Sequence, residues 1–68
     1  MSKCNLTPRE IEIVKNIANG DRNKDIARKL YISEKTVRNH ITDIHYKLSL
    51  ENRVQVAAYA FRNRLVDI

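Results

Sequence analysis

Segment 34–48 carries side chains of the types that read base pairs. If it is a helix turning ~100° per residue, Lys35, Arg38, Asn39 and Thr42 lie on adjacent turns of one face. Arginine suits a two-point contact with guanine and asparagine one with adenine, whereas lysine and short hydroxyls suit phosphates or mixed contacts. The face therefore predicts contact with duplex DNA. A merely solvated polar face is the alternative, and spacing alone does not decide between the two.

The apolar residues of this segment and of the one before it predict how the helix that carries this face packs in the fold. One stripe of the same segment is aliphatic, at Val37, Ile41, Ile44 and Leu48, and Ser33 is placed to cap the helix. A shorter helix is expected before it, capped by Asn23, with inward residues Ile26, Ala27 and Leu30. Only "YIS" separates the two helices. Two helices joined by so tight a turn are typical of a helix-turn-helix.

Two more helices are expected to flank this pair. "LTPREI" predicts a helix start with Thr7 as N-cap, Pro8 at the first position and Glu10 completing a capping box, and the helix is expected to run to about Asn19. A last helix is expected from about Arg53 to Leu65. Its predicted inward residues are Val54, Ala57, Ala58, Phe61 and Leu65, which leaves Val56, Tyr59 and Ala60 on its outer side. The predicted fold is all-α, with a flexible leader at 1–5 and one domain at 6–68.

The composition narrows the class of partner. The chain has 68 residues, with 13 Lys and Arg against 8 Asp and Glu, a formal net charge of +5 and a pI near 9.7. Such a balance favours a polyanion. No apolar run reaches the roughly 20 residues that span a bilayer, and no signal-peptide pattern follows Met1. A lone cysteine, Cys4, agrees with a reducing compartment. We therefore expect a cytoplasmic protein without a membrane partner.

Enzymatic chemistry has little support in the sequence. His40 and His45 are five residues apart, hence on different faces of a helix, and neither forms a metal-ligand spacing with Cys4. Gly20 stands alone, so there is no Gly-rich phosphate loop, and no nucleophile is paired with a base. The prediction is a non-enzyme that needs no metal and no cofactor.

Three stretches together resemble the DNA-binding domain of the LuxR/FixJ/NarL family of bacterial transcription regulators, and most of all its GerE-like branch. They are "LTPREIEIVKNIANG", "NKDIARKLYISEKTVRNHI" and "KLSLENRVQVAAYA", and the likeness covers about residues 6 to 65. The resemblance implies a four-helix fold, with helices two and three as the helix-turn-helix and helix four as a dimer contact. Members occur alone or as the output domain of a response regulator.

The resemblance also implies roles for single residues. Arg38, Asn39 and Thr42 occupy the base-reading positions. Phosphate contacts are expected, by the same resemblance, from Lys35, Thr36 and Lys47 and from the start of helix two at Asn23 and Lys24. His45 and Tyr46 are added as phosphate contacts because of their place on the polar side of helix three. Val56, Tyr59 and Ala60 are the predicted dimer contact. Arg53 is expected to pair with an acidic group or a helix end.

The predicted function is sequence-specific binding of double-stranded DNA in transcription regulation. A weak homodimer should occupy two related half-sites on the bacterial nucleoid, and contact with RNA polymerase is a further expectation. The alternative is a basic helical module that binds RNA or another protein. Readers of single-stranded RNA usually offer several stacking aromatic side chains, whereas Tyr46 is the one aromatic residue on the predicted basic face.

Overall fold

Four helices make up the part of the chain that the computed structural model describes, residues 6–66. They are α1 (Pro8–Ala18), α2 (Asn23–Leu30), α3 (Glu34–Leu48) and α4 (Arg53–Arg62), and no strand occurs within that range. This confirms the all-α prediction. None of these helices has the length and apolarity needed to cross a bilayer. The predicted leader 1–5, with Cys4, lies outside the described residues, as do residues 67–68.

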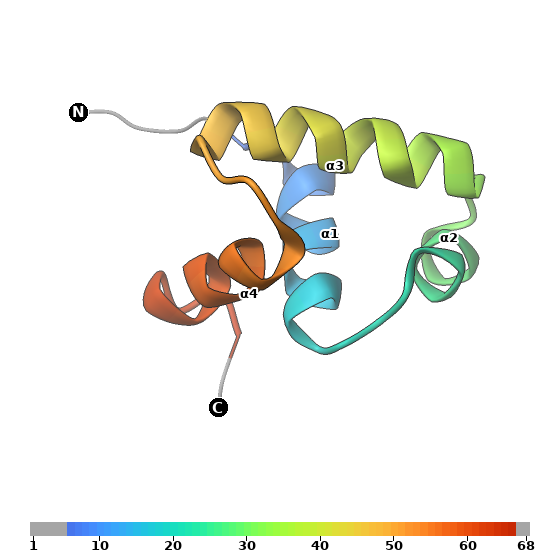
Figure 1. Cartoon of the computed structure of the whole chain (residues 1–68). Coiled ribbons are helices and arrows are strands. Elements are labelled where there is room, and N and C mark those ends of the chain that lie inside the picture. Colours follow the sequence, from blue (N-terminus) through green and yellow to red (C-terminus); the bar gives the residue numbers. More distant parts are fainter. Residues whose placement is uncertain (1–5, 67–68) are drawn as a thin grey trace.

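Helix α1 begins where the sequence predicts and lies in the middle of the molecule (Figure 1). The hydroxyl of Thr7 accepts a hydrogen bond from the Glu10 backbone N–H (3.1 Å), and Oε1 of Glu10 accepts one from the Thr7 backbone N–H (2.9 Å). Pro8 occupies the first turn, where no N–H is needed. The helix packs against α3 and, more extensively, against α4.

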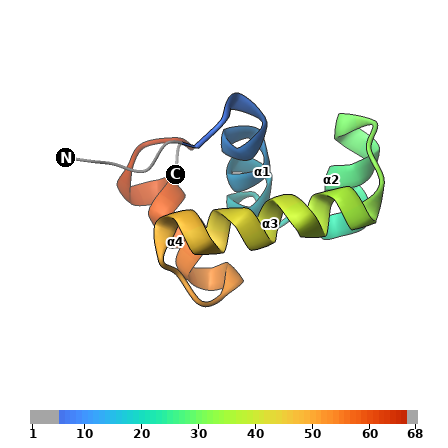
Figure 2. The same cartoon turned by 90° about the horizontal axis from the view of Figure 1, so that it is seen from above.

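Helices α2 and α3 form the predicted helix-turn-helix, seen from above in Figure 2. Tyr31 ends α2 in the left-handed conformation (φ 59°, ψ 43°), which reverses the chain within a few residues. Ser33 then caps α3, because its hydroxyl accepts a hydrogen bond from the Thr36 backbone N–H at 3.0 Å. The pairing of α2 with α3 therefore depends on short-range turn chemistry as well as on packing.

The prediction that Asn23 caps α2 is wrong. The N-cap is Arg22, and Asn23 is the first residue of the helix. Instead of a side-chain cap, Asp25 Oδ2 accepts a hydrogen bond from the Arg22 backbone N–H at 3.1 Å, and this bond holds the pKa of the Asp25 carboxyl below its ordinary value. Asn23 is not free to cap because its own Oδ1 accepts a hydrogen bond from Arg53 (2.8 Å).

The core draws on all four helices. Its buried members are Ile13, Val14, Ile17, Ile26, Ala27, Val37, Ile44, Val56 and Ala60. Val37 and Ile44 confirm the predicted inner stripe of α3, and the other two members of that stripe are half-buried beside them. The opposite side of α3 is thereby left facing outwards.

Helix α4 packs mainly with the face opposite to the one predicted, although two of the predicted inward residues, Ala57 and Leu65, are half-buried against the core. Val56 and Ala60 are fully buried, so they cannot form the predicted dimer contact, and Tyr59 is partly buried against the same core. Val54 (77% exposed) and Phe61 (39% exposed), predicted to point inwards, lie on the surface. The helix also ends at Arg62 rather than near Leu65. Both faces of α4 are apolar, and packing against α1 selects the one that is buried.

Candidate nucleic-acid interface

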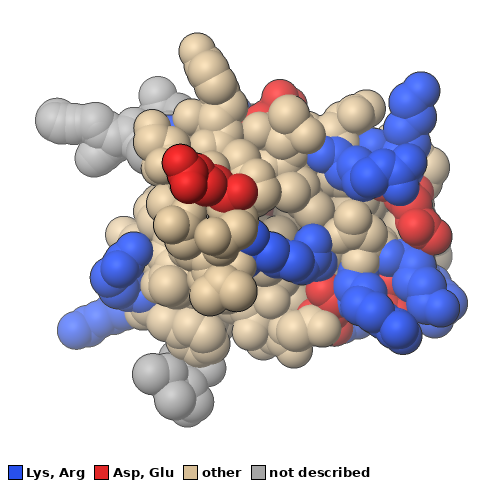
Figure 3. Space-filling model, in the orientation of Figure 1, with Lys and Arg blue, Asp and Glu red and all other residues tan. Residues whose placement is uncertain are grey.

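The outer face of α3 presents polar side chains over two successive turns. Lys35, Arg38, Asn39 and Thr42 are all exposed, as the helical spacing predicts. Lys and Arg side chains also gather over α2 and the neighbouring end of α3 (Figure 3). A helix with exposed polar side chains on one side and a buried aliphatic stripe on the other has the form that enters a major groove.

The hydrogen bonds of two hydroxyls on α3, those of Thr42 and Thr36, indicate what each can offer to a ligand. The Thr42 hydroxyl donates to the Arg38 backbone carbonyl one turn earlier (3.1 Å), which leaves its oxygen as an acceptor and its methyl group exposed. Ser33 donates its hydroxyl proton to the Thr36 hydroxyl oxygen (2.9 Å), so the proton of Thr36 remains available to an outside acceptor. Thr42 can therefore accept from a base amino group or touch a thymine methyl, and Thr36 can donate to a phosphate.

Lys47, a predicted phosphate contact, is tied to the protein. Its Nζ lies 2.8 Å from Oε1 of Glu10, whose side chain is only 4% exposed. Burial alone would raise the pKa of the Glu10 carboxyl. Hydrogen bonds from Lys47 and from the Thr7 backbone N–H, with the positive charge of Lys47, outweigh burial and hold that pKa below its ordinary value. The geometry gives Lys47 a structural role that joins the end of α3 to the start of α1.

The other two predicted contacts on the far half of α3 differ from each other. The Nε2 atom of His45 is buried and has no hydrogen-bond partner among the described residues, so that nitrogen does not face a phosphate. Tyr46 is 88% exposed, and its phenol is available to a ligand. Tyr31, at the turn between α2 and α3, is 94% exposed and was not among the predicted contacts.

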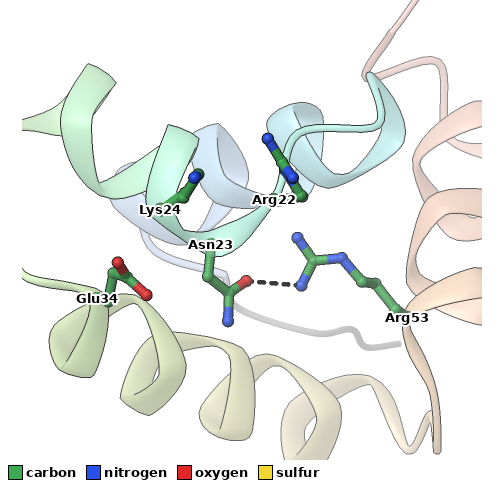
Figure 4. Close-up of a pocket in the computed structure, with 5 residues that line it drawn as sticks. All are labelled: Arg22, Asn23, Lys24, Glu34 and Arg53. Carbon is green, nitrogen blue, oxygen red and sulfur yellow. Dashed lines mark hydrogen bonds between the residues drawn. The ribbon is translucent and has the colours of Figure 1, made fainter.

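The start of α2 borders an open pocket of about 390 Å³, lined by Arg22, Asn23, Lys24, Glu34 and Arg53 (Figure 4). It brings together the beginnings of α2, α3 and α4. Arg53 confirms the expectation that it pairs with a helix end, because it donates to Asn23 Oδ1 at 2.8 Å and to the Asp21 backbone carbonyl at 2.7 Å. Arg22 was missed because the sequence offers no local signal that sets it apart from other exposed arginines.

The chain is similar to curated bacterial regulatory proteins. The chain is 52% identical over 62 residues to the transcriptional regulatory protein LiaR of Bacillus subtilis (strain 168), covering 91% of this chain and 29% of LiaR. It is 45% identical over 62 residues to the oxygen regulatory protein NreC of Staphylococcus carnosus (strain TM300), covering 91% of this chain and 29% of NreC. The chain thus spans less than a third of the length of these curated relatives.

Solved structures share the arrangement of helices. The transcription factor GerE superposes with a TM-score of 0.81 at 40% identity, covering 91% of this chain and 92% of GerE. The response regulator ChrA of a heme-sensing two-component system gives a TM-score of 0.84 at 39% identity, covering 97% of this chain and 33% of ChrA. The family model described as "Bacterial regulatory proteins, luxR family" matches residues 4–60. The chain therefore belongs to the LuxR family of bacterial regulatory proteins.

Proposed function

We propose that this chain binds double-stranded DNA and serves as the DNA-binding domain of a transcription regulator, with α3 in the major groove. The observation that carries the proposal is the outer face of α3, where a lysine, an arginine, an asparagine and a threonine are exposed on adjacent turns of a helix-turn-helix. The net charge of +5 favours the same polyanionic partner. The role places the chain in the cytoplasm, on the nucleoid when DNA is bound.

The contacts divide into those that read bases and those that hold the backbone. Arg38, Asn39 and Thr42 are assigned to bases, with Thr42 acting through its methyl group and its acceptor oxygen. The phosphate contacts are assigned to Asn23, Lys24, Lys35, Thr36 and Tyr46. Lys47 and His45 are left out, because Lys47 is paired with the buried Glu10 and Nε2 of His45 is turned into the protein.

A two-fold dimer is proposed through the outer face of α4. Val54, Ala58 and Phe61 recur at helical spacing there, and Val54 and Phe61 are the exposed large apolar residues of this helix. A helix of 10 residues buries too little surface for a stable interface by itself, so the dimer should be weak without DNA. Two copies would place two α3 helices about one turn of DNA apart, on related half-sites. Contact with RNA polymerase stays a prediction.

Selection of bound duplexes from a random pool tests the proposal. We expect enrichment of one sequence made of two related half-sites, and an affinity that falls steeply as salt increases, because Lys and Arg release counterions from phosphates. A pool of single-stranded RNA with the same random region serves as the comparison. No enrichment from duplex DNA, or equal binding of RNA, would refute the proposed function.

A further inference from the structure

The Arg53 side chain connects two helices that otherwise pack on different partners. Helix α2 packs chiefly on α3, whereas α4 packs chiefly on α1. Arg53 is the first residue of α4, and its guanidinium reaches the start of α2 with two hydrogen bonds, 2.8 Å to Asn23 Oδ1 and 2.7 Å to the Asp21 backbone carbonyl. The carboxylate of Asp21 is held in turn by Lys29 Nζ at 2.7 Å. The loop that enters α2 is therefore fixed from both sides.

Arg53 also decides which way the Asn23 amide faces. A guanidinium has only donors, so the amide atom that it meets must be the oxygen. The amide nitrogen Nδ2 is consequently directed away from Arg53, toward the space between α2 and α3 (Figure 4). Without this hydrogen bond the amide could turn its acceptor oxygen to the same place. A donor there attracts a phosphate oxygen, whereas an acceptor repels it.

We propose that Arg53 is a positioning residue for DNA binding, which holds Oδ1 of Asn23 so that Nδ2 of Asn23 donates to a DNA phosphate beside Lys24. The inference rests on the proposed function and adds to it. Both observed hydrogen bonds of Arg53 are made within the protein, and the effect proposed for it on DNA binding runs through Asn23. The link runs from the first turn of α4 to the backbone contacts of the helix-turn-helix.

Replacing Asn23 by aspartate separates folding from binding. Asn23→Asp keeps an acceptor for Arg53 and converts the pair to a charge-assisted one, so the melting temperature should be unchanged or higher. It removes the donor and adds a negative charge, so duplex affinity should fall about tenfold or more. Asn52→Asp is the matched control. It changes the charge by the same amount and keeps an acceptor for the Gln55 backbone N–H at the start of α4. We expect its duplex affinity to lie within about threefold of the parent, because charges far from the DNA are screened.

Changing Arg53 tests whether it acts through Asn23. Arg53→Lys keeps the charge but loses the fixed fork of donors. We expect about three- to tenfold weaker duplex binding, with little change in the slope of log affinity against log salt, because the amide of Asn23 is uncharged and Arg53→Lys keeps the positive charge. In an Asn23→Ala background the same change should alter affinity by less than about twofold, because the residue through which Arg53 acts is already gone.

These variants are compared by fluorescence anisotropy on the selected duplex at several salt concentrations, with thermal melting of each chain. Equal affinity of Asn23→Asp and Asn52→Asp would show that Nδ2 meets no phosphate, and the inference would be wrong. An Arg53→Lys effect that persists in full without the Asn23 amide would overturn it as well. A parent chain that binds no duplex would refute the proposed function, and this inference with it.

Discussion

The residues on the outer face of α3 differ in what each can recognise. Arg38 and Asn39 can each make a two-point contact with a base edge, whereas Lys35 offers a point charge. We expect Arg38→Ala or Asn39→Ala to cost about 1–3 kcal/mol of binding free energy on the selected duplex and much less on a scrambled one. Lys35→Ala should weaken both alike. Titration of the two duplexes gives the readout. If Arg38→Ala lost the same binding free energy on both, Arg38 would be a phosphate contact.

Three exposed residues, Tyr31, Ser49 and Arg64, have a backbone conformation that favours glycine, and the first two of them end helices. Tyr31 (φ 59°) and Ser49 (φ 55°) end α2 and α3 in the left-handed region. Tyr31→Gly and Ser49→Gly should each raise the free energy of unfolding by about 1 kcal/mol, a rise in melting temperature of about 4–8 °C for a domain of this size. Tyr31→Ala is the control, because it keeps a β-carbon. Equal melting of the Gly and Ala variants would show that the backbone is not strained at this position.

Some single-residue roles could be predicted where the partners are near in sequence, although the pairing of Arg22 with Asp25 at the start of α2 was missed. The capping box of Thr7 and Glu10 and the cap of Ser33 join residues three apart, and both are present. The role of Asn23 could not be predicted, because its partner Arg53 is thirty residues away and an asparagine before a helix is typical of a cap. For the same reason the pairing of Lys47 with Glu10 was not foreseen.

At the scale of the elements, the Lys47–Glu10 ion pair joins the end of α3 to the start of α1. The pKa of Glu10 is held below its ordinary value in the folded chain, so the unfolded chain takes up the proton first as the pH falls. The pair's contribution to the free energy of unfolding is therefore fully present above the pKa of Glu10 in the unfolded chain, about 4.3. It is lost as the pH falls through the lower pKa of Glu10 in the folded chain. Chemical denaturation of the parent at several pH values should show this loss as a lower free energy of unfolding in acid. Glu10→Gln should have a lower free energy of unfolding than the parent at neutral pH, and that free energy should fall less on acidification. An unchanged pH profile in Glu10→Gln would contradict the assignment.

Helix α4 shows where periodicity fails to predict structure. Its sequence contains two apolar stripes at helical spacing, and composition cannot tell which one α1 will cover. The structure buries Val56 and Ala60 and exposes Val54 and Phe61. In α3 the same reasoning succeeded because only one of its faces is aliphatic, so its bounds and its inner stripe could be predicted.

The two faces of α4 should respond differently to a buried or exposed charge. Val54→Glu and Phe61→Glu are expected to leave the free energy of unfolding of the monomer within about 1 kcal/mol of the parent. Both should abolish cooperative binding to a duplex that carries two half-sites. Val56→Glu should unfold the chain, because Val56 is 0% exposed and an unpaired carboxylate cannot be accommodated there. Gel-shift titrations on one and two half-sites give the readout. Cooperative binding that survives in Phe61→Glu and Val54→Glu would remove α4 as the dimer surface.

At the scale of the whole molecule, α3 runs across one side of α1, with α2 packed at its beginning, and α4 lies against α1 nearer the end of α3 (Figure 1). Lys and Arg side chains gather over α2 and the beginning of α3 (Figure 3). The all-α class and the helix-turn-helix could be predicted because they follow from caps, a tight turn and one clear aliphatic stripe. The contact between the start of α4 and the start of α2 depends on how the helices cross, which local sequence does not specify.

The central claim is that the outer face of α3, with the start of α2, binds duplex DNA. The most direct test is to follow the backbone amide resonances of the ¹⁵N-labelled chain while a duplex carrying one half-site of the selected sequence is added. The account predicts that the largest changes fall on residues 35–42 and on residues 22–24, and that those of α1 and the outer face of α4 change little on a single half-site. Largest changes in α1 or α4, or a spectrum unaltered by excess duplex, would contradict it.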